Sequence, residues 1–138
     1  MKARVKLVDG MTFVAESGSG HAVVMDAAPD VGGRDLGPRP MEMVLMGAGG
    51  CSAIDVVHIL RKSRQDLVDC VVELEAERAD EDPKVFTRIH MHYIVTGRGL
   101  NPAQVERAIK LSKEKYCSAT IMLAKTADVT SDYEIREA

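Results

Sequence analysis

The first 27 residues alternate between apolar and polar positions, and glycine-containing turns interrupt the alternation. Residues 3–7 place Ala, Val and Leu side chains between Arg and Lys, and this period of two is typical of a strand with one buried face. The Asp-Gly pair at 9–10 predicts a tight turn, and residues 11–16 predict a second strand. A Ser-Gly-Ser-Gly turn then leads to a third strand at residues 21–26. Residues 1–27 therefore predict a β-meander.

A loop rich in proline and glycine follows the meander. Residues 28–40 contain three of the five prolines and three of the 11 glycines of the chain. A loop of this length inside a small domain is either a functional segment or a linker, and the sequence leaves both interpretations open. The length of 138 residues indicates one domain, which we divide into the meander at 1–27, the loop at 28–39 and a helix-containing core at 40–138.

The segment from Pro40 to about Arg64 predicts the longest helix. Pro40 suits the first helical turn, where its missing N–H has no cost, and apolar side chains surround the helix nearly completely as far as Leu60. We therefore expect a long, central and buried helix. Twelve uncharged residues separate Glu42 from Asp55, whereas a membrane span needs about 20, so the pattern favours a core helix over a membrane helix.

Three glycines in this helix need an explanation. Gly47, Gly49 and Gly50 each destabilise a helix by about 1 kcal/mol relative to alanine. Close approach of another backbone, or of a substrate, to the segment just before Cys51 would offset that cost.

The second half of the chain predicts two long strands, two helices and a final strand. Alternating apolar and polar residues indicate strands at 68–77 and 85–95. An asparagine-proline pair marks a helix start, so residues 102–116 predict a helix, and 118–125 predict a short helix after it. Apolar positions within 129–135 suggest the last strand. The order βββ-α-ββ-α-β indicates an α+β fold with antiparallel sheets rather than a doubly wound fold.

The charge pattern excludes some classes of partner. The chain has 18 basic and 21 acidic residues, and the basic ones are scattered, whereas nucleic-acid-binding proteins usually carry a basic stripe. We expect neither a nucleic-acid partner nor a membrane partner. The first ten residues lack the apolar core of a signal peptide, so we expect a cytoplasmic protein.

The candidate chemistry lies in three cysteines, Cys51, Cys70 and Cys117. Their odd number, wide spacing and lack of a C-x-x-C motif fit neither a disulfide framework nor a zinc finger. Cys70 alternates with apolar strand residues, so we expect it in the core. Cys51 is either core filling or a nucleophile. Cys117 precedes the short helix, where a helix N-terminus favours a thiolate, although a small structural residue fits that position equally well.

The histidines predict no metal centre. His58 shares a helical face with Cys51 and Asp55, but the rise of about 10 Å over seven residues is too long for direct proton transfer. We therefore expect a structural histidine there. His90 and His92 share one strand face without a third ligand at a clear spacing, so we expect a solvated face and no metal site.

Two motifs taken together suggest a known family. The stretch "RPMEMVLMGAGGCSAIDVV" has Pro40 eleven residues before Cys51, and "KEKYCSAT" places Cys117 just after a helix. Together they resemble the OsmC/Ohr family of osmotically inducible and organic hydroperoxide resistance proteins, with the closest likeness to its YhfA-type branch. The resemblance covers essentially the whole chain and includes the order of its elements.

The resemblance implies an intertwined homodimer in which two long helices pack at the centre and each active site takes residues from both subunits. It also implies a thiol peroxidase that reduces organic hydroperoxides to alcohols. Cys51 would become a sulfenic acid, and Cys117 would condense with it to a disulfide. A dithiol reductant, lipoyl-linked in parts of the family, would restore both thiols. No metal or organic cofactor is implied.

The family also uses an arginine and a glutamate at the thiolate, and here the sequence departs from it. Met41 stands where the family glutamate is usual, so Glu42 is the replacement candidate. The first turn lacks the family arginine, so Arg34 is the candidate catalytic arginine, and Arg39 is a candidate for binding the substrate. The predicted site comprises the catalytic residues Cys51, Cys117, Glu42 and Arg34 and the substrate-binding residues Arg39, Gly49 and Gly50.

Two other functions stay open at this point. The departures from the family pattern favour a non-catalytic ligand-binding or redox-sensing protein that keeps the same scaffold. A thiol hydrolase that pairs Cys51 with a histidine of the partner subunit is the third possibility.

Overall fold

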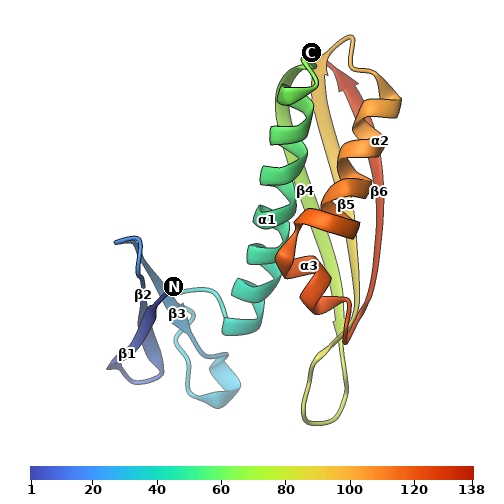
Figure 1. Cartoon of the computed structure of the whole chain (residues 1–138). Coiled ribbons are helices and arrows are strands. Elements are labelled where there is room, and N and C mark those ends of the chain that lie inside the picture. The colour runs from blue at the N-terminus through green and yellow to red at the C-terminus, as the bar shows by residue number, and fades with distance from the viewer. The chain divides into compact units, whose positions relative to one another are not determined.

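The computed structural model describes residues 1–138 as two compact units, Met1–Val44 and Leu45–Ala138 (Figure 1). The first unit contains three strands, a loop and the start of the long helix. The second unit contains the rest of that helix and all later elements. Strands and helices occupy separate stretches of the chain, which confirms the predicted α+β class.

The first three strands form the predicted meander. The strands β1 (Ala3–Asp9), β2 (Thr12–Ser17) and β3 (Ala22–Asp26) pair antiparallel in the order β1-β2-β3. Only Thr12 and Asp26 are buried in this unit, whereas Val5 and Leu7 of β1 are 57% and 53% exposed. A three-stranded sheet by itself therefore leaves much of its apolar surface in contact with water.

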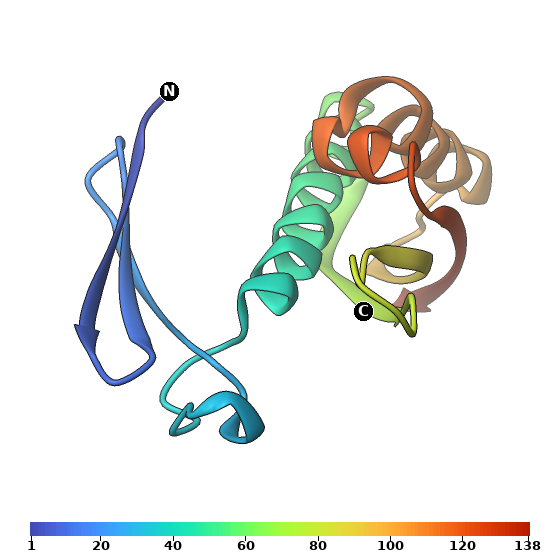
Figure 2. The same cartoon turned by 90° about the horizontal axis from the view of Figure 1, so that it is seen from below.

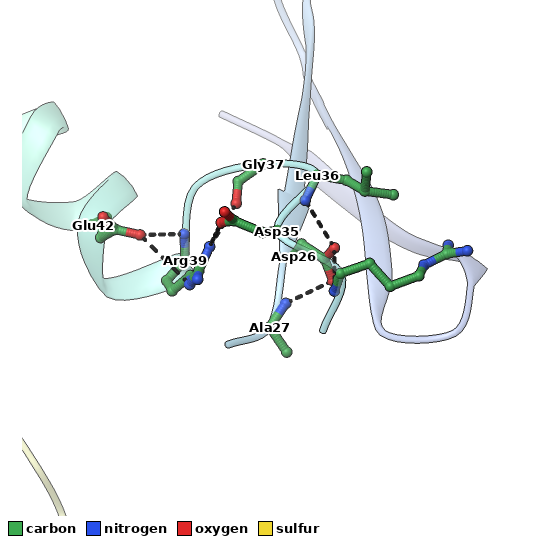
Figure 3. Close-up of polar contacts among 8 residues, drawn as sticks. Asp26, Ala27, Asp35, Leu36, Gly37, Arg39 and Glu42 are labelled. Carbon is green, nitrogen blue, oxygen red and sulfur yellow. Dashed lines mark hydrogen bonds and ion pairs between the residues drawn. The ribbon is translucent and has the colours of Figure 1, made fainter. Parts of the chain in front are cut away.

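One buried carboxylate organises the loop after β3 (Figure 3). Asp26 accepts the N–H groups of Ala27 at 2.9 Å, Arg34 at 3.1 Å and Leu36 at 3.2 Å. Burial alone would raise the pKa of Asp26, but these N–H groups hold it below its ordinary value. A short 3-10 helix, Pro29–Val31, also lies in this loop. The loop is therefore an ordered part of the first unit.

The long helix α1 (Pro40–Lys62) starts at the predicted proline and ends within two residues of the predicted end. Glu42 caps its first turn, because its carboxylate accepts the N–H of Arg39 at 2.8 Å. By length and composition α1 is the one helix that could cross a membrane, a test that the core helices of water-soluble proteins pass as well.

Within one chain, α1 buries only one face. Met46 and Ile54, two apolar residues of α1, are 50% and 71% exposed. The predicted burial of the helix therefore holds for one face in the single chain, since the second sheet covers one face only. The buried residues recur every three or four positions, as one helical face requires: Ala48, Gly49, Ser52, Val56 and Leu60.

The second sheet differs from the prediction at its last strand. The strands β4 (Asp66–Arg78) and β5 (Phe86–Arg98) pair antiparallel, but β6 (Asp128–Glu137) pairs parallel with β5. The predicted antiparallel arrangement is therefore wrong for β6. The reason is the helical connection between β5 and β6, which returns the chain to the end where β5 begins, and such a crossover delivers the next strand in the same direction.

The helical connection comprises α2 (Pro102–Leu111), the π-helical turn η2 (Ser112–Tyr116) and α3 (Ser118–Leu123). The prediction of one regular helix up to Tyr116 is therefore corrected. The N–H of Cys117 bonds the carbonyl of Ser112 at 2.8 Å, the five-residue step of a π-turn, and such turns are frequent at functional sites.

Figures 1 and 2 show α1 and α2 on the same face of the second sheet. Their apolar sides and the inward side chains of β5 make the core of the second unit. Its buried residues include Val56, Leu60, Ile89, Met91, Tyr93, Val95, Val105 and Ala108.

Candidate active site at two cysteines

The side chains of Cys51 and Cys117 are neighbours, close enough for Cys51 to raise the pKa of Cys117. Cys51 is half-buried on α1, and Cys117 is fully buried between η2 and α3. Both residues are free thiols. The fold of the second unit thus brings two cysteines that are distant in the sequence into one site.

Backbone groups enclose the Cys117 thiol. Its thiol donates to the carbonyl of Ala48 at 3.9 Å, and its sulfur accepts the N–H of Thr120 at 3.5 Å. Burial raises the pKa of Cys117; the contacts with Thr120 partly oppose this, and the neighbouring Cys51 adds to it. The sequence left two interpretations of Cys117 open, a thiolate at a helix N-terminus and a small structural residue. The effect of burial on the pKa of Cys117 is larger than the opposing effect of the start of α3.

A chain of buried hydroxyl groups adjoins the two thiols. Ser52 Oγ lies 2.6 Å from the Tyr93 hydroxyl and 2.8 Å from Ser112 Oγ. Ser112 in turn donates to Asp55 Oδ2 at 3.0 Å. Burial raises the pKa of Tyr93 to about 12, although the bond to Ser52 lowers it. The sequence did not point to Ser52, Tyr93 or Ser112, and a serine directly after Cys51 in an otherwise apolar helix was the available signal.

An open cavity of about 510 Å³ lies between α1 and the segment 107–116. Asp55 belongs both to this cavity and to the hydroxyl chain. His58 lines the cavity as well, on the same helix. The full lining comprises Asp55, His58, Ile59, Lys62, Ser63, Arg107, Leu111 and Tyr116.

Arg34 lies in the first unit, at the turn between β1 and β2. Its guanidinium is 3.2 Å from Asp9 Oδ2 and donates to Thr12 Oγ1 at 3.4 Å. The same group would lie 3.9 Å from a Cβ atom on Gly10. Arg34 therefore brings a guanidinium to the first turn, although it comes from the loop after β3 and not from the turn itself.

Arg39 and Glu42 face each other at the start of α1 (Figure 3). The Arg39 guanidinium bonds Asp35 at 2.6 Å and lies 3.9 Å from Glu42 Oε1. The hydrogen bond to Asp35 raises the pKa of Arg39. In this chain, Arg39 is thus paired with acidic neighbours, and the Glu42 carboxylate is engaged as the helix cap.

The two glycines predicted to bind substrate have different surroundings. Gly49 is buried against Leu74 of β4, so its lack of a side chain serves packing inside the chain. Gly50 is exposed, and a Cβ atom there would meet nothing within 4 Å. Gly50 therefore leaves open space directly beside Cys51.

The remaining candidates are two histidines and the third cysteine. His90 and His92, on the sheet face opposite Tyr93, both contact Asp132 Oδ1, at 3.2 and 2.6 Å. Cys70 of β4 is half-buried, and burial raises its pKa.

Comparison with known proteins identifies the family. A family model described as OsmC-like protein matches residues 32–132. The chain belongs to the OsmC-like family. Among OsmC-like relatives, Protein YhfA of Escherichia coli (strain K12) is 57% identical over 135 residues, which cover 98% of each chain. The resemblance inferred from the two cysteine motifs is therefore confirmed.

Solved structures share the OsmC-like fold. A hypothetical protein from Aquifex aeolicus superposes with a TM-score of 0.88 at 28% identity, covering 99% of this chain and 96% of that one. An organic hydroperoxide resistance protein, OsmC, from Legionella pneumophila gives a TM-score of 0.71 at 18% identity over 97% of both chains. At that identity the likeness shows the fold alone.

Proposed function

We propose that this OsmC-like protein is a thiol-dependent peroxidase that reduces organic hydroperoxides to alcohols. The proximity of Cys117 to the helix segment that carries Cys51 supports the proposal, because a two-cysteine peroxidase needs a second thiol beside the oxidised one. Two further facts support it: Cys51 is the more accessible of the two thiols, and a structural relative is described as an organic hydroperoxide resistance protein.

The proposed reaction has three steps. Cys51 attacks the terminal peroxide oxygen, so that an S–O bond forms, the O–O bond breaks, and the alcohol leaves with a proton. Cys117 then attacks the Cys51 sulfenic acid; an S–S bond forms, and the hydroxyl leaves with the thiol proton as water. An external dithiol, for which a lipoyl group is our candidate, reduces the disulfide by two exchange steps. These steps require neither a metal nor an organic cofactor.

The proposal assigns roles to the charged residues of the first unit. Arg34 and Glu42 would activate Cys51, while Arg39 and Gly50 would receive the peroxide; Gly49 would serve the packing against Leu74 instead. The position of the Arg34 guanidinium over Gly10 supports the first assignment, because the family arginine belongs to this turn. The open space beside Gly50 supports an approach of substrate to Cys51 from that side.

We further propose that the active protein is a cytoplasmic homodimer whose subunits share their active sites. Exposed apolar side chains support this arrangement, since a second copy would remove them from water. They lie on the meander and on α1, at Val5, Leu7, Val23, Val44, Met46 and Ile54. Light scattering after size-exclusion chromatography would give twice the mass of one chain; a monomer at assay concentrations would exclude shared sites.

Cysteine variants test the peroxidase. Cys51→Ser should abolish the consumption of cumene hydroperoxide with dihydrolipoamide, and Cys117→Ser should abolish turnover while the Cys51 sulfenic acid accumulates. Cys70→Ser is the matched control and should keep full activity, because Cys70 has no role in the proposed steps. Peroxide consumption that survives in Cys51→Ser would contradict the proposal.

A non-catalytic ligand-binding or redox-sensing function is the second candidate. Met41 at the place of the family glutamate favours it, and so do the pairings of Arg34 with Asp9 and of Arg39 with Asp35. Stopped-flow measurement separates the two functions. A reaction of the protein with cumene hydroperoxide that is no faster than that of a simple free thiol would favour the sensing or binding function.

A further inference from the structure

A directed chain of hydrogen bonds crosses the core of the second unit. It consists of the Tyr93 hydroxyl, Ser52 Oγ, Ser112 Oγ and the carboxylate of Asp55, with successive distances of 2.6, 2.8 and 3.0 Å. Tyr93, Ser52 and Ser112 are each at most 1% exposed. Water therefore has no access to these hydroxyl groups, and each must be satisfied inside the chain.

The number of donors fixes the direction of this chain. A carboxylate only accepts, and each hydroxyl has a single proton to donate. Because Ser112 gives its proton to Asp55, Ser52 must be the donor to Ser112. Tyr93 must then be the donor to Ser52 at 2.6 Å, in preference to its 3.8 Å contact with the weakly accepting sulfur of Met91. Every proton thus points toward Asp55, and replacing Ser112 or Asp55 by an apolar residue leaves a buried hydroxyl proton without an acceptor.

Ser52 and Ser112, the two serines of the hydrogen-bond chain, are each connected to one of the two cysteines. Ser52 follows Cys51 directly on α1. The carbonyl of Ser112 accepts the N–H of Cys117 at 2.8 Å and so closes the π-turn that carries this cysteine. The bond between Ser52 and Ser112 therefore ties the helix that carries one thiol to the turn that carries the other.

We propose that Tyr93, Ser52, Ser112 and Asp55 are positioning residues that hold the segments carrying Cys51 and Cys117 next to each other. None of them touches the peroxide. The role in turnover rests on the proposed peroxidase, in which Cys117 must meet the Cys51 sulfenic acid and release water. Cys117 is fully buried, so its side chain has little freedom to move toward Cys51. The position of η2 relative to α1 therefore decides how readily the disulfide forms.

The disulfide equilibrium tests the proposal without any peroxide. In a Cys70→Ser background, oxidised glutathione converts the two thiols to the disulfide and releases two reduced glutathione molecules. Mass spectrometry of the protein at set glutathione ratios gives the equilibrium constant. We expect Ser52→Ala and Ser112→Ala to lower it by about tenfold or more, whereas Val105→Ala, a buried change in α2 outside the hydroxyl chain, should lower the thermal midpoint and leave the constant unchanged.

Asp55 gives a second test should the serine variants fail to fold, because it is only half-buried at the cavity wall. Asp55→Asn keeps an acceptor for Ser112 and should keep the equilibrium constant, while Asp55→Leu removes the acceptor and should lower it. Equal constants in both variants, or an unchanged constant in folded Ser52→Ala, would overturn the positioning role. If the constants change as expected but peroxide reacts no faster than with a free thiol, the positioning role stands and the proposed peroxidase fails.

Discussion

Gly49 and Leu74 pack so closely that a Cβ atom on Gly49 would lie 2.7 Å from Leu74 Cδ1. A real Cβ contact at that distance forces one side to move. Gly50, one residue further along α1, has open space at the same position. Gly49 is therefore required by packing inside the chain, whereas only a substrate or a second chain could require a glycine at position 50.

Alanine at these two positions should have different effects on stability. Each substitution gains about 1 kcal/mol of helix propensity, but Gly49→Ala also requires the flexible end of Leu74 to move, and overpacking of this kind offsets the gain by up to about 3 kcal/mol. We expect urea unfolding to show Gly50→Ala as the more stable variant. If Gly50→Ala destabilises the protein as strongly as Gly49→Ala, a surface outside the single chain contacts Gly50.

The direction of the hydroxyl chain predicts an order of stability among its variants. Ser112→Ala leaves the Ser52 hydroxyl without an acceptor, at a cost of about 1–3 kcal/mol. Tyr93→Phe removes only the donor at the start of the chain, so we expect a smaller loss of about 0.5–1.5 kcal/mol. Denaturant titrations of both variants would measure the difference. A larger loss in Tyr93→Phe would mean that the protons point the other way.

The pair of His92 and Asp132 predicts a pH dependence of stability. The hydrogen bond to Asp132 raises the pKa of His92, and the same bond lowers the pKa of Asp132. The contribution of His92 is full below its ordinary pKa of 6.5 and is lost as the pH rises through the raised value of the folded protein. The contribution of Asp132 is present above its ordinary 3.8 and is lost as the pH falls through the lowered value.

We therefore expect the wild-type protein to exceed His92→Gln in thermal midpoint most between about pH 4 and 6.5. The difference should shrink as the pH rises further, and calorimetry across this range would follow it. His21→Gln serves as the control, since His21 lies on the meander outside this pair. A difference between wild type and His92→Gln that grows with pH would contradict the assignment.

Arg34 should matter for the peroxide reaction more than other arginines of the first unit. Arg34→Ala removes the guanidinium at Gly10, and loss of one electrostatic group at a reacting centre costs about 10²–10³ in rate. Arg4→Ala, which removes a surface pair with Glu16 on the same sheet, is the matched control and should react like the wild type. Stopped-flow rates with cumene hydroperoxide compare them; equal rates for Arg34→Ala and wild type would remove Arg34 from the site.

Local pattern predicted most of the elements. Alternating residues define β1, β4 and β5, and Pro40 and Asn101 mark the starts of α1 and α2, because these signals depend only on nearest neighbours along the chain. The two cysteine motifs were also sufficient to identify the family. The sequence by itself thus determined the class of fold and the kinship of the protein.

The tertiary structure decided what depends on packing between distant segments. The parallel direction of β6 follows from the helical crossover, and the one-sided burial of α1 follows from a single covering sheet. The π-turn at Ser112 and the hydroxyl chain through Ser52 arise only when α1, β5 and η2 meet. A serine in an apolar helix has no visible partner in the sequence, because hydrogen bonds of buried side chains form across the fold and leave no periodic signal.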